Sequence, residues 1–282
     1  MKNYKGKTFI ITGAAGEIGS SICRHFAHEG LRFYLLDLES QLVKCNELAG
    51  ELMNMGAQHA EGMVMDVTNP EQIKEVITKI GEEEKYIDIL VNNAGYGNTN
   101  SITNEGTIEI FRKMMAVNVE GPWMITQAAL PYLGRPVKKP PKKNKDQREG
   151  QLIYIESSAG KVGVPYMASY VATKHALVGI ADVVRMEMKI KNEKIQVISI
   201  CPAPAKTKFW DKTKDMRGFM NNYEQKGFLY SAITADDVGK AVYRASRGNK
   251  NEVMVPRWWY LLPFIRSLSI GFTDKLLVNI GK

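Results

Sequence analysis

The stretch Thr8–Gly19 reads TFIITGAAGEIG and joins an apolar, β-branched run to a turn that carries glycines at 13, 16 and 19. Residues 8–12 are typical of a buried strand, and the amphipathic segment that follows Gly19 is typical of a helix. A dinucleotide pyrophosphate needs a tight turn, close approach of the backbone and a helix N-terminus that faces the phosphates. A strand–helix turn without a ligand is the alternative, but the strand–turn–helix context favours the ligand.

The rest of the chain repeats the same alternation of strands and helices. Apolar runs predict further strands at 31–36, 63–67, 87–91, 151–156, 195–200 and 252–255, and helical spacing predicts helices at 40–55, 69–80, 108–131, 170–190 and 234–246. This order predicts an α/β fold with one Rossmann-like, doubly wound parallel sheet and helices on both of its faces. We expect it to form one domain over residues 1–255.

An acidic residue ends the second predicted strand, because LRFYLL at 31–36 runs directly into Asp37. A carboxylate at that place can accept hydrogen bonds from an adenosine ribose and would repel a 2′-phosphate. Glu17 adds a second negative charge in the glycine turn. Asp37 therefore favours NAD over NADP, although an acid at the start of a helix is the alternative reading.

Other polar and small residues follow predicted strands at the edge where a parallel sheet binds ligands. Asp66 lies near the end of the third strand, residues 92–95 read NNAG after the fourth, Ser157 follows the fifth, and residues 201–207 read CPAPAKT after the sixth. Asn118 lies in a mostly apolar helical segment, where it must find hydrogen bonds. It is either a structural, helix-distorting residue or part of a proton relay, and the residues alone leave both open.

Tyr170 and Lys174 are four residues apart on a predicted helix, so their side chains share one face. A cation beside a phenol favours phenolate and lowers the tyrosine pKa from about 10 toward neutral pH. A tyrosine tuned in this way can act as a general acid or base. The pair alone is weak evidence, because it also occurs on ordinary solvated helices.

The ordered set of motifs resembles the classical short-chain dehydrogenase/reductase family over residues 7–255. The set comprises TGAAGEIG at 12–19, the acid at 37, DV at 66–67, NNAG at 92–95, Asn118, Ser157 and Tyr170-x-x-x-Lys174. The resemblance implies an NAD(P)-dependent oxidoreductase that interconverts an alcohol and a ketone or aldehyde by hydride transfer. The spacing of thirteen residues to Tyr170 selects Ser157 over Ser158.

The resemblance also implies a role for each matched residue. Tyr170 would be the general acid/base, Ser157 would polarise the substrate oxygen, and Lys174 would lower the Tyr170 pKa and bind the nicotinamide ribose. Asn118 would order a water beside Lys174, Asp66 and Val67 would flank the adenine, Asn92 would line the cofactor cleft, and Thr207 would contact the carboxamide. The expected catalytic residues are Asn118, Ser157, Tyr170 and Lys174, and the expected cofactor-binding residues are Gly13, Gly16, Glu17, Ile18, Gly19, Asp37, Asp66, Val67, Asn93, Ala94, Gly95, Tyr170, Lys174, Pro202 and Thr207.

Two positions depart from the family pattern. Ala203 follows Pro202 where the family usually has glycine, so the backbone of that loop could be displaced. Glu156 precedes Ser157 where the family usually has serine, and this position need not face the substrate.

Three further segments are unusual. Residues 208–233 are rich in aromatic residues and methionine, as a substrate-covering lid would be. Residues 134–149 read GRPVKKPPKKNKDQRE and hold most of the net charge of +8; they could be a solvated loop, an anionic-lipid contact near the C-terminal tail, or, less favoured for lack of aromatic residues, a nucleic-acid contact.

The tail at 256–282 places aromatic residues beside basic ones. This pattern suits an interfacial helix at a membrane, or a segment that packs on its own subunit, on a partner or over the substrate pocket. Similar tails in the family accompany lipid or steroid substrates, so a hydrophobic substrate is expected.

The composition bounds the remaining predictions. The chain has 282 residues, of which 44% are hydrophobic and 24% charged, as in an ordinary globular protein. The three scattered cysteines indicate neither a disulfide framework nor a metal site, and fit a reducing compartment. We expect a cytoplasmic homodimer or homotetramer with a small carbonyl or alcohol substrate and no metal. A peripheral location at the inner membrane face is the alternative to a purely cytoplasmic one. The alternatives are a catalytically impaired NAD-binding regulatory or scaffold protein and a membrane interaction protein.

Overall fold

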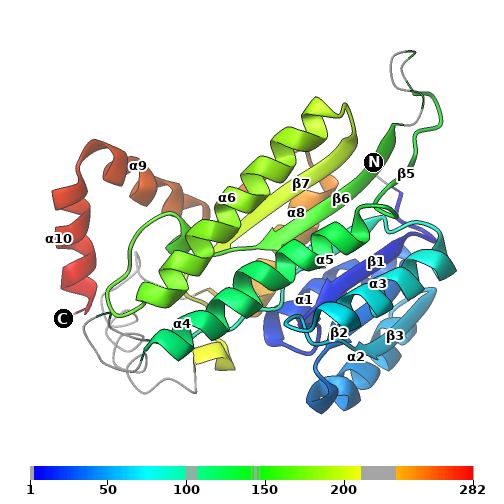
Figure 1. Ribbon diagram of the computed structural model, residues 1–282, viewed down its shortest axis with the longest axis horizontal. Coiled ribbons are helices and arrows are strands. Elements are labelled where there is room, and N and C mark those ends of the chain that lie inside the picture. The colour runs from blue at the N-terminus through cyan, green and yellow to red at the C-terminus, as the bar shows by residue number, and fades with distance from the viewer. Residues whose placement is uncertain are drawn as a thin grey trace.

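The computed structural model describes residues 3–99, 102, 107–140, 142, 145, 147–210 and 233–281. Its centre is a twisted sheet with the strand order β3-β2-β1-β4-β6-β7-β8, in which all of these neighbours pair in parallel (Figure 1). The predicted doubly wound parallel sheet is confirmed. The strands are β1 (Thr8–Thr12), β2 (Arg32–Asp37), β3 (His59–Val64), β4 (Ile89–Asn92), β6 (Arg148–Ile155), β7 (Lys194–Pro202) and β8 (Glu252–Val255).

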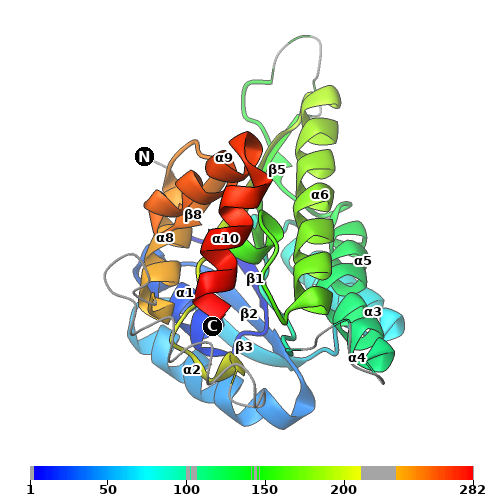
Figure 2. The ribbon, with the colours of Figure 1, turned by 90° about the vertical axis from the view of Figure 1, so that its left-hand side faces the viewer.

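Helices cover both faces of the sheet. One layer holds α1, α2 and α8, and the opposite layer holds α3, α4, α5 and α6 (Figure 2). Their bounds are α1 Glu17–Phe26, α2 Leu42–Asn54, α3 Pro70–Glu84, α4 Ile108–Met115, α5 Gly121–Ala129, α6 Ala168–Ile190 and α8 Ala235–Arg247. Short 3-10 turns occupy Ala27–Glu29, Glu39–Gln41, Ser158–Gly160, Lys208–Trp210 and Arg257–Tyr260.

Two hydrophobic cores lie on the two sides of the sheet because successive strand residues point to opposite faces. Along β1, Phe9 and Ile11 join the core under α1 and α2, whereas Ile10 joins the core under α3, α5 and α6. All three side chains are fully buried. A strand buried on both faces reads as a continuous apolar run, which is why residues 8–12 were recognisable from the sequence.

The structure differs from the predicted elements at a sheet edge and at a hairpin. β3 is His59–Val64 instead of 63–67, because this edge strand is only half buried and lacks a continuous apolar pattern. A short strand β5 (Arg135–Pro136) pairs antiparallel with β6 and was not predicted. The predicted helix at 108–131 is divided by a π-helical turn at Ala116–Glu120.

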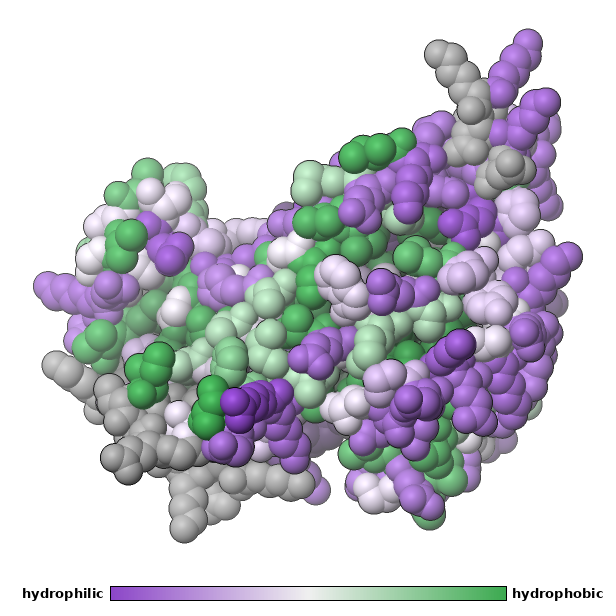
Figure 3. Space-filling view, viewed as in Figure 1, coloured by the Kyte–Doolittle hydropathy of each residue, from purple (hydrophilic) through white to green (hydrophobic). Residues whose placement is uncertain are grey.

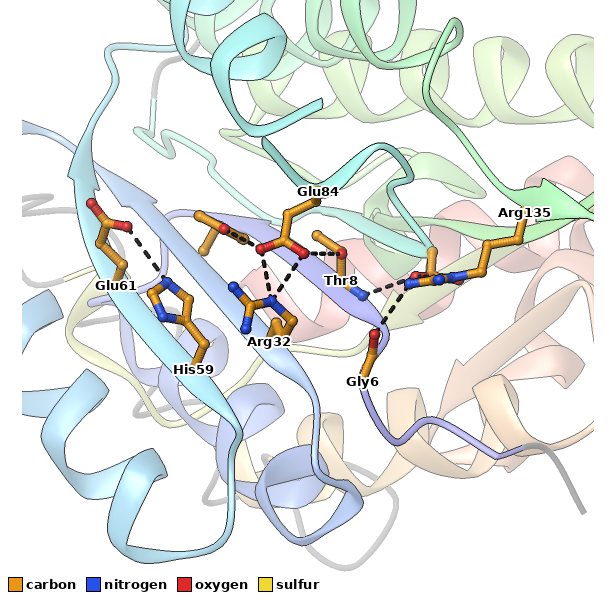
Figure 4. A network of polar contacts seen from close by, with 9 residues as sticks. Gly6, Thr8, Arg32, His59, Glu61, Glu84 and Arg135 are labelled. Carbon is orange, nitrogen blue, oxygen red and sulfur yellow. Dashed lines mark hydrogen bonds and ion pairs between the residues drawn. The ribbon is translucent and has the colours of Figure 1, made fainter. Parts of the chain in front are cut away.

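A polar network fixes the ends of the strands on the side away from their carboxyl termini (Figure 4). Glu84 accepts hydrogen bonds from Arg32 Nε at 2.7 Å and from Thr8 Oγ1 at 3.3 Å. Asp88 accepts from the Thr8 backbone N–H at 2.9 Å and from Arg135 Nε at 2.7 Å. These contacts hold β1, β2 and the β5 hairpin together and leave the opposite edge of the sheet for the site.

The basic insert and the C-terminal tail lie at opposite ends of the molecule. β5 belongs to the insert, and the tail forms α9 (Leu261–Leu268) and α10 (Ile270–Gly281) at the other end of the long axis (Figure 1). The part of the insert that the structure describes therefore does not lie near the tail. Among the described residues, no helix is long and apolar enough to cross a membrane.

Candidate active site

The glycine turn forms a backbone cradle between β1 and α1. Gly13 has a left-handed φ of 64°, which favours glycine. A Cβ on Gly19 would lie 2.3 Å from the Gly13 carbonyl oxygen and 2.9 Å from Asn93 Nδ2, so the turn has no room for a side chain there. The cradle therefore has the shape that the pyrophosphate motif requires.

Asn93 ties the loop after β4 to this turn. Its Nδ2 donates to the carbonyl oxygens of Thr12 at 2.9 Å and Gly13 at 3.0 Å, and Thr12 Oγ1 accepts from the backbone N–H groups of Asn93 and Ala94. Asn92 points to the opposite face, where it is buried and its Nδ2 donates to Thr126 Oγ1 at 3.3 Å. The expectation that Asn92 lines the cofactor cleft is wrong, because alternation along β4 turns its side chain toward α5.

Asp37 lies at the carboxyl end of β2, beside the turn. Its Oδ2 accepts a hydrogen bond from the Ala15 N–H at 2.9 Å, and its Oδ1 accepts from the Leu38 N–H at 2.8 Å. These two bonds fix the carboxylate at the edge of the cradle. Glu17, in the first turn of α1, accepts from the backbone N–H of Lys208 at 2.6 Å and so holds the loop after β7 across the same edge.

The side chains of Tyr170, Lys174 and Ser157 lie close together near this edge of the sheet. Tyr170 and Lys174 lie one turn apart on α6, with Lys174 Nζ 5.6 Å from the centre of the Tyr170 ring. Lys174 Nζ donates to the carbonyl oxygen of Ile155 at 3.1 Å, which ties α6 to the end of β6. Ser157 follows β6 directly, and its Oγ accepts from the Ala159 N–H at 3.1 Å. The hydroxyl hydrogen of Ser157 is not used in that bond, and Ser157 also hydrogen-bonds with Tyr170.

Burial governs the ionisation of both groups on α6. Burial raises the pKa of Tyr170 to about 12, and hydrogen bonding with Ser157 opposes the rise. Burial lowers the pKa of Lys174 to about 8, against a rise caused by the negative charge of Glu156. The predicted lowering of the Tyr170 pKa by Lys174 is thus not observed. In this geometry, desolvation of the phenolate outweighs an ammonium that faces the ring and is bonded to Ile155.

The Asn118 side chain makes structural hydrogen bonds beside the site. Asn118 lies in the π-helical turn, and its side chain exchanges two hydrogen bonds of 2.8 Å with the backbone of Tyr96 and donates to Thr173 Oγ1 at 3.1 Å. Thr173 in turn donates to the Tyr170 carbonyl oxygen. A Cβ on Gly95 would lie 3.6 Å from Asn118 Oδ1 and 3.9 Å from Lys174 Nζ, so Asn118 is close to Lys174. Its side chain positions the loop after β4 against α6.

A cavity of about 610 Å³ connects these parts along the carboxyl edge of the sheet. This volume lies in the range of small-molecule and cofactor sites. Asp66, Val67 and Asn118 do not line the cavity; Asp66 accepts from Thr68 after the end of β3. The predicted site residues that do line it are Gly13, Gly16, Glu17, Ile18, Gly19, Asp37, Asn93, Ala94, Gly95, Ser157, Tyr170, Lys174, Pro202 and Thr207.

The cavity is also lined by residues that the sequence did not identify. Trp259 and Leu277 come from the tail, which therefore packs over the pocket, and Phe209 lies with its ring centre 6.1 Å from that of Tyr170. The aromatic composition of the tail and of residues 208–233 was the available signal, but only tertiary packing assigns single residues. Most of the predicted lid, residues 211–232, lies outside the described residues.

The loop after β7 keeps its place in the sheet although Ala203 stands where glycine was expected. The backbone N–H of Ala203 donates to the Val255 carbonyl oxygen at 2.7 Å, which extends the pairing of β7 with β8. The predicted lid is closed at its base by hydrogen bonds between Lys206 and Ile233 and between Ile233 and Pro204. The loop therefore starts from the sheet edge next to the cavity.

Glu156 lines the cavity, an orientation that the sequence left open. It is 2% exposed, and burial raises the pKa of its carboxyl group. Cys201 Sγ on β7 donates to its Oε2 at 3.2 Å. Lys161 also lies near the carboxyl, and its own Nζ bonds Glu252 on β8 at 2.5 Å. A buried carboxyl group thus lies behind the Lys174 ammonium.

We expect Glu156→Gln to shift the alkaline limit of activity to lower pH. The negative charge of Glu156 raises the pKa of Lys174, so its removal lets burial lower that pKa further below about 8. Lys174 then loses its proton at a lower pH. We expect the ratio of the rate at pH 8.5 to the rate at pH 7 to be roughly threefold lower in Glu156→Gln than in the wild type. A pH–rate profile measures the shift.

Glu252→Gln is the matched control, because it removes a carboxylate of the same cluster that is paired with Lys161 and does not act on the Lys174 pKa. A profile of Glu156→Gln that coincides with that of the control would show that Glu156 has no influence on Lys174.

The residues present fit a nicotinamide dinucleotide. The side-chain-free cradle, the N-terminus of α1 and the Asp37 carboxylate match the pyrophosphate and ribose, and the cavity continues from them to Tyr170. At the far end of that cavity, a proton donor lies beside a second hydroxyl and a cation. Such a group can protonate an oxygen on which negative charge develops, while the hydroxyl and the cation stabilise that charge.

Known proteins agree with this arrangement. The family model described as short chain dehydrogenase matches residues 7–218. The oxidoreductase UcpA of Escherichia coli K12 is 32% identical over 209 residues, which cover 73% of this chain and 72% of UcpA.

Two solved structures share the fold. A short-chain dehydrogenase/reductase from Burkholderia phymatum, in complex with NAD, aligns with a TM-score of 0.79 and 20% identity over 96% of both chains. An alcohol dehydrogenase from Thermococcus sibiricus, complexed with 5-hydroxy-NADP, aligns with a TM-score of 0.71 and 23% identity over 89% of this chain and 96% of that chain. The chain therefore belongs to the short-chain dehydrogenase family of oxidoreductases.

Proposed function

We propose that the protein interconverts a hydrophobic carbonyl compound and the corresponding secondary or primary alcohol by hydride transfer. The observation that carries this proposal is that Ser157, Tyr170 and Lys174 line the same cavity as the dinucleotide cradle. A regulatory protein that binds a dinucleotide and catalyses no reaction does not need a buried proton donor beside a buried cation. Val162, Val164 and Met167 add apolar walls near Tyr170, as a lipid-like substrate requires.

In the direction of reduction, the bound nicotinamide supplies the hydride to the carbonyl carbon. The Ser157 hydroxyl donates a hydrogen bond to the substrate oxygen, and Tyr170 transfers its phenolic proton to that oxygen as negative charge develops on it. A tyrosine with a pKa of about 12 is protonated at neutral pH and is therefore ready to act as this acid. The Lys174 ammonium stabilises the phenolate that remains.

We propose NAD as the preferred cofactor because the Asp37 carboxylate is fixed at the ribose end of the cradle. Lys44 also lines the cavity there, but its Nζ donates to Gln41 Oε1 at 3.0 Å. A 2′-phosphate would have to approach the negative charge of Asp37, which a 2′-hydroxyl does not.

We expect NADH to be oxidised faster than NADPH in a spectrophotometric assay with a series of ketones of rising chain length. Asp37→Asn keeps an acceptor for the Ala15 N–H and removes the charge, so it should raise the ratio of NADPH to NADH use about tenfold. Glu39→Gln, an exposed acid two residues away, is the control. An unchanged ratio in Asp37→Asn would contradict the cofactor assignment, and no oxidation with any ketone would contradict the reaction.

We also propose that copies of the chain assemble through the outer faces of α5 and α6. Trp123, Val183 and Met186 are about half exposed on these helices, and apolar side chains gather over this side of the molecule (Figure 3). Sedimentation equilibrium of the full chain measures the assembly. A monomer at micromolar concentration would contradict it.

A further inference from the structure

The two C-terminal helices expose an apolar surface, which we call the tail face. Six large hydrophobic side chains on this surface are between 45% and 73% exposed, and all six fall within a segment of eighteen residues. Scattered single apolar residues are normal on a protein surface, whereas such a concentration marks an interaction site. The residues of the tail face are Leu261, Phe264, Leu268, Ile270, Phe272 and Val278.

The tail helices form an outer layer of the molecule. α9 and α10 pack on each other and on the 3-10 turn that precedes them, and both lie outside the two helix layers of the sheet (Figures 1 and 2). In Figure 3, the apolar atoms of this region project from the end of the molecule opposite the basic insert. The tail face therefore turns away from the catalytic domain.

The inner side of the same segment belongs to the pocket. Trp259 and Leu277 are 7% and 8% exposed and line the catalytic cavity, and they pack with Val162, Cys201 and Met254. The segment thus has a buried side on the cavity, formed by the 3-10 turn and α10, and an exposed apolar side. Whatever binds the tail face lies one helix thickness, about 10 Å, from the cavity.

Cations predominate among the exposed charges of this segment. Arg257, Arg266 and Lys275 are exposed, against the single acid Asp274. Phe272, Lys275 and Val278 follow at spacings of three along α10, which places the ammonium of Lys275 between two apolar side chains on one side of the helix. Apolar and aromatic side chains interspersed with Lys and Arg are the composition of a helix that lies in an anionic membrane surface.

We propose that α9 and α10 dock the protein on an anionic lipid bilayer through the tail face, and that the cavity receives its hydrophobic substrate from that bilayer. Long basic side chains can bury their stems in the apolar layer while their charges reach lipid phosphates. A second copy placed on the same face would instead bring cations against cations. The docking is independent of the reaction, whereas the delivery of substrate rests on the proposed function.

Co-sedimentation of the full chain with lipid vesicles tests the docking. We expect binding to vesicles of phosphatidylcholine with 30% phosphatidylglycerol that is at least about tenfold tighter than binding to pure phosphatidylcholine, and that weakens in salt. The variant Phe264→Ser/Leu268→Ser/Phe272→Ser should lose at least about tenfold in affinity for the anionic vesicles. None of these three side chains lines the cavity.

A matched control removes exposed apolar side chains elsewhere. Val43, Met53 and Ile190 are 70%, 46% and 82% exposed on α2 and α6, so the variant Val43→Ser/Met53→Ser/Ile190→Ser should bind vesicles as the wild type does. Thermal melts of both variants confirm that each is folded. Oxidation of NADH with a water-soluble ketone reports that the site is intact and tests the reaction separately from the docking.

Delivery is tested with a long-chain ketone dissolved in the anionic vesicles. The tail variant should lose about tenfold in rate on this substrate and keep its rate on the water-soluble ketone. The docking proposal is overturned if the full chain stays in the supernatant with both vesicle types, or if the tail variant binds as well as the control. It is also overturned if the tail variant loses only self-association, which would assign the tail face to a second copy.

Discussion

Tyr170→Phe is expected to lower kcat for ketone reduction by about 10³-fold, because it removes the phenolic proton donor that lies beside Ser157 and Lys174 in the cavity. The side chain is 7% exposed, so water has little access to replace it. The ring itself is retained, and with it the packing against Phe209 and the Lys174 ammonium. The Kd of NADH, measured by fluorescence titration, should therefore change less than threefold.

Tyr154→Phe is the matched control for this loss. Tyr154 lies on β6 close to the site, is fully buried, and exchanges a hydrogen bond of 2.8 Å with Thr126. Its replacement should cost about 1 kcal/mol of stability and leave kcat nearly unchanged. If Tyr170→Phe kept more than a tenth of the wild-type kcat, another group would have to supply the proton and the assignment would be withdrawn.

Gly19→Ala is expected to weaken dinucleotide binding, because a Cβ at this position would lie 2.3 Å from the Gly13 carbonyl oxygen. The contact involves backbone and cannot be relieved by a change of rotamer, so the turn has to open and the pyrophosphate loses its cradle. Overpacking of this kind costs roughly 1–3 kcal/mol of stability. We expect the Kd of NADH to rise by at least about tenfold and the melting temperature to fall.

Two other helical glycines provide the control for Gly19. Gly50 in α2 and Gly179 in α6 are exposed, and a Cβ on either meets nothing within 4 Å. Alanine at these positions should stabilise the protein by about 0.5–1 kcal/mol and leave NADH binding unchanged. The same substitution is thus expected to have opposite effects on stability at 19 and at 50. A Gly19→Ala protein that bound NADH normally would show that the turn does not hold the pyrophosphate.

The two predictions test different ends of one cavity. Gly19 belongs to the cradle at the start of α1, whereas Tyr170 lies on α6 beside the end of β6. Loss of binding without loss of folding in the first variant, and loss of turnover without loss of binding in the second, would together separate cofactor binding from proton transfer.

Much of the fold could be predicted from local patterns. Strands buried on both faces read as continuous apolar runs, and glycine turns and helix starts such as Asn69-Pro70 have local signatures. β3 was misplaced because an edge strand is half exposed and mixes polar with apolar residues, and β5 was missed because its two residues acquire their conformation from pairing with β6.

The parts of the site that could be predicted are those whose function depends on certain residue types at a fixed spacing in the sequence. Glycines 13, 16 and 19, Asp37, Ser157 and the pair Tyr170 and Lys174 line one cavity as expected. Spacing does not specify which way a residue faces at a strand end, so Asn92 was wrongly assigned to the cleft and the place of Glu156 in the cavity wall was not predicted.

The sequence by itself determined the doubly wound fold and the glycine turn, and it singled out Tyr170 as the proposed proton donor, because these depend on local periodicity and on residues close in the chain. Only the tertiary structure showed that Glu156 lies behind Lys174 and that burial raises the pKa of Tyr170. It also showed that the tail covers the cavity through Trp259 and Leu277 and exposes its other side. Desolvation and contacts between distant segments depend on how the whole chain packs, and no short stretch of sequence encodes them.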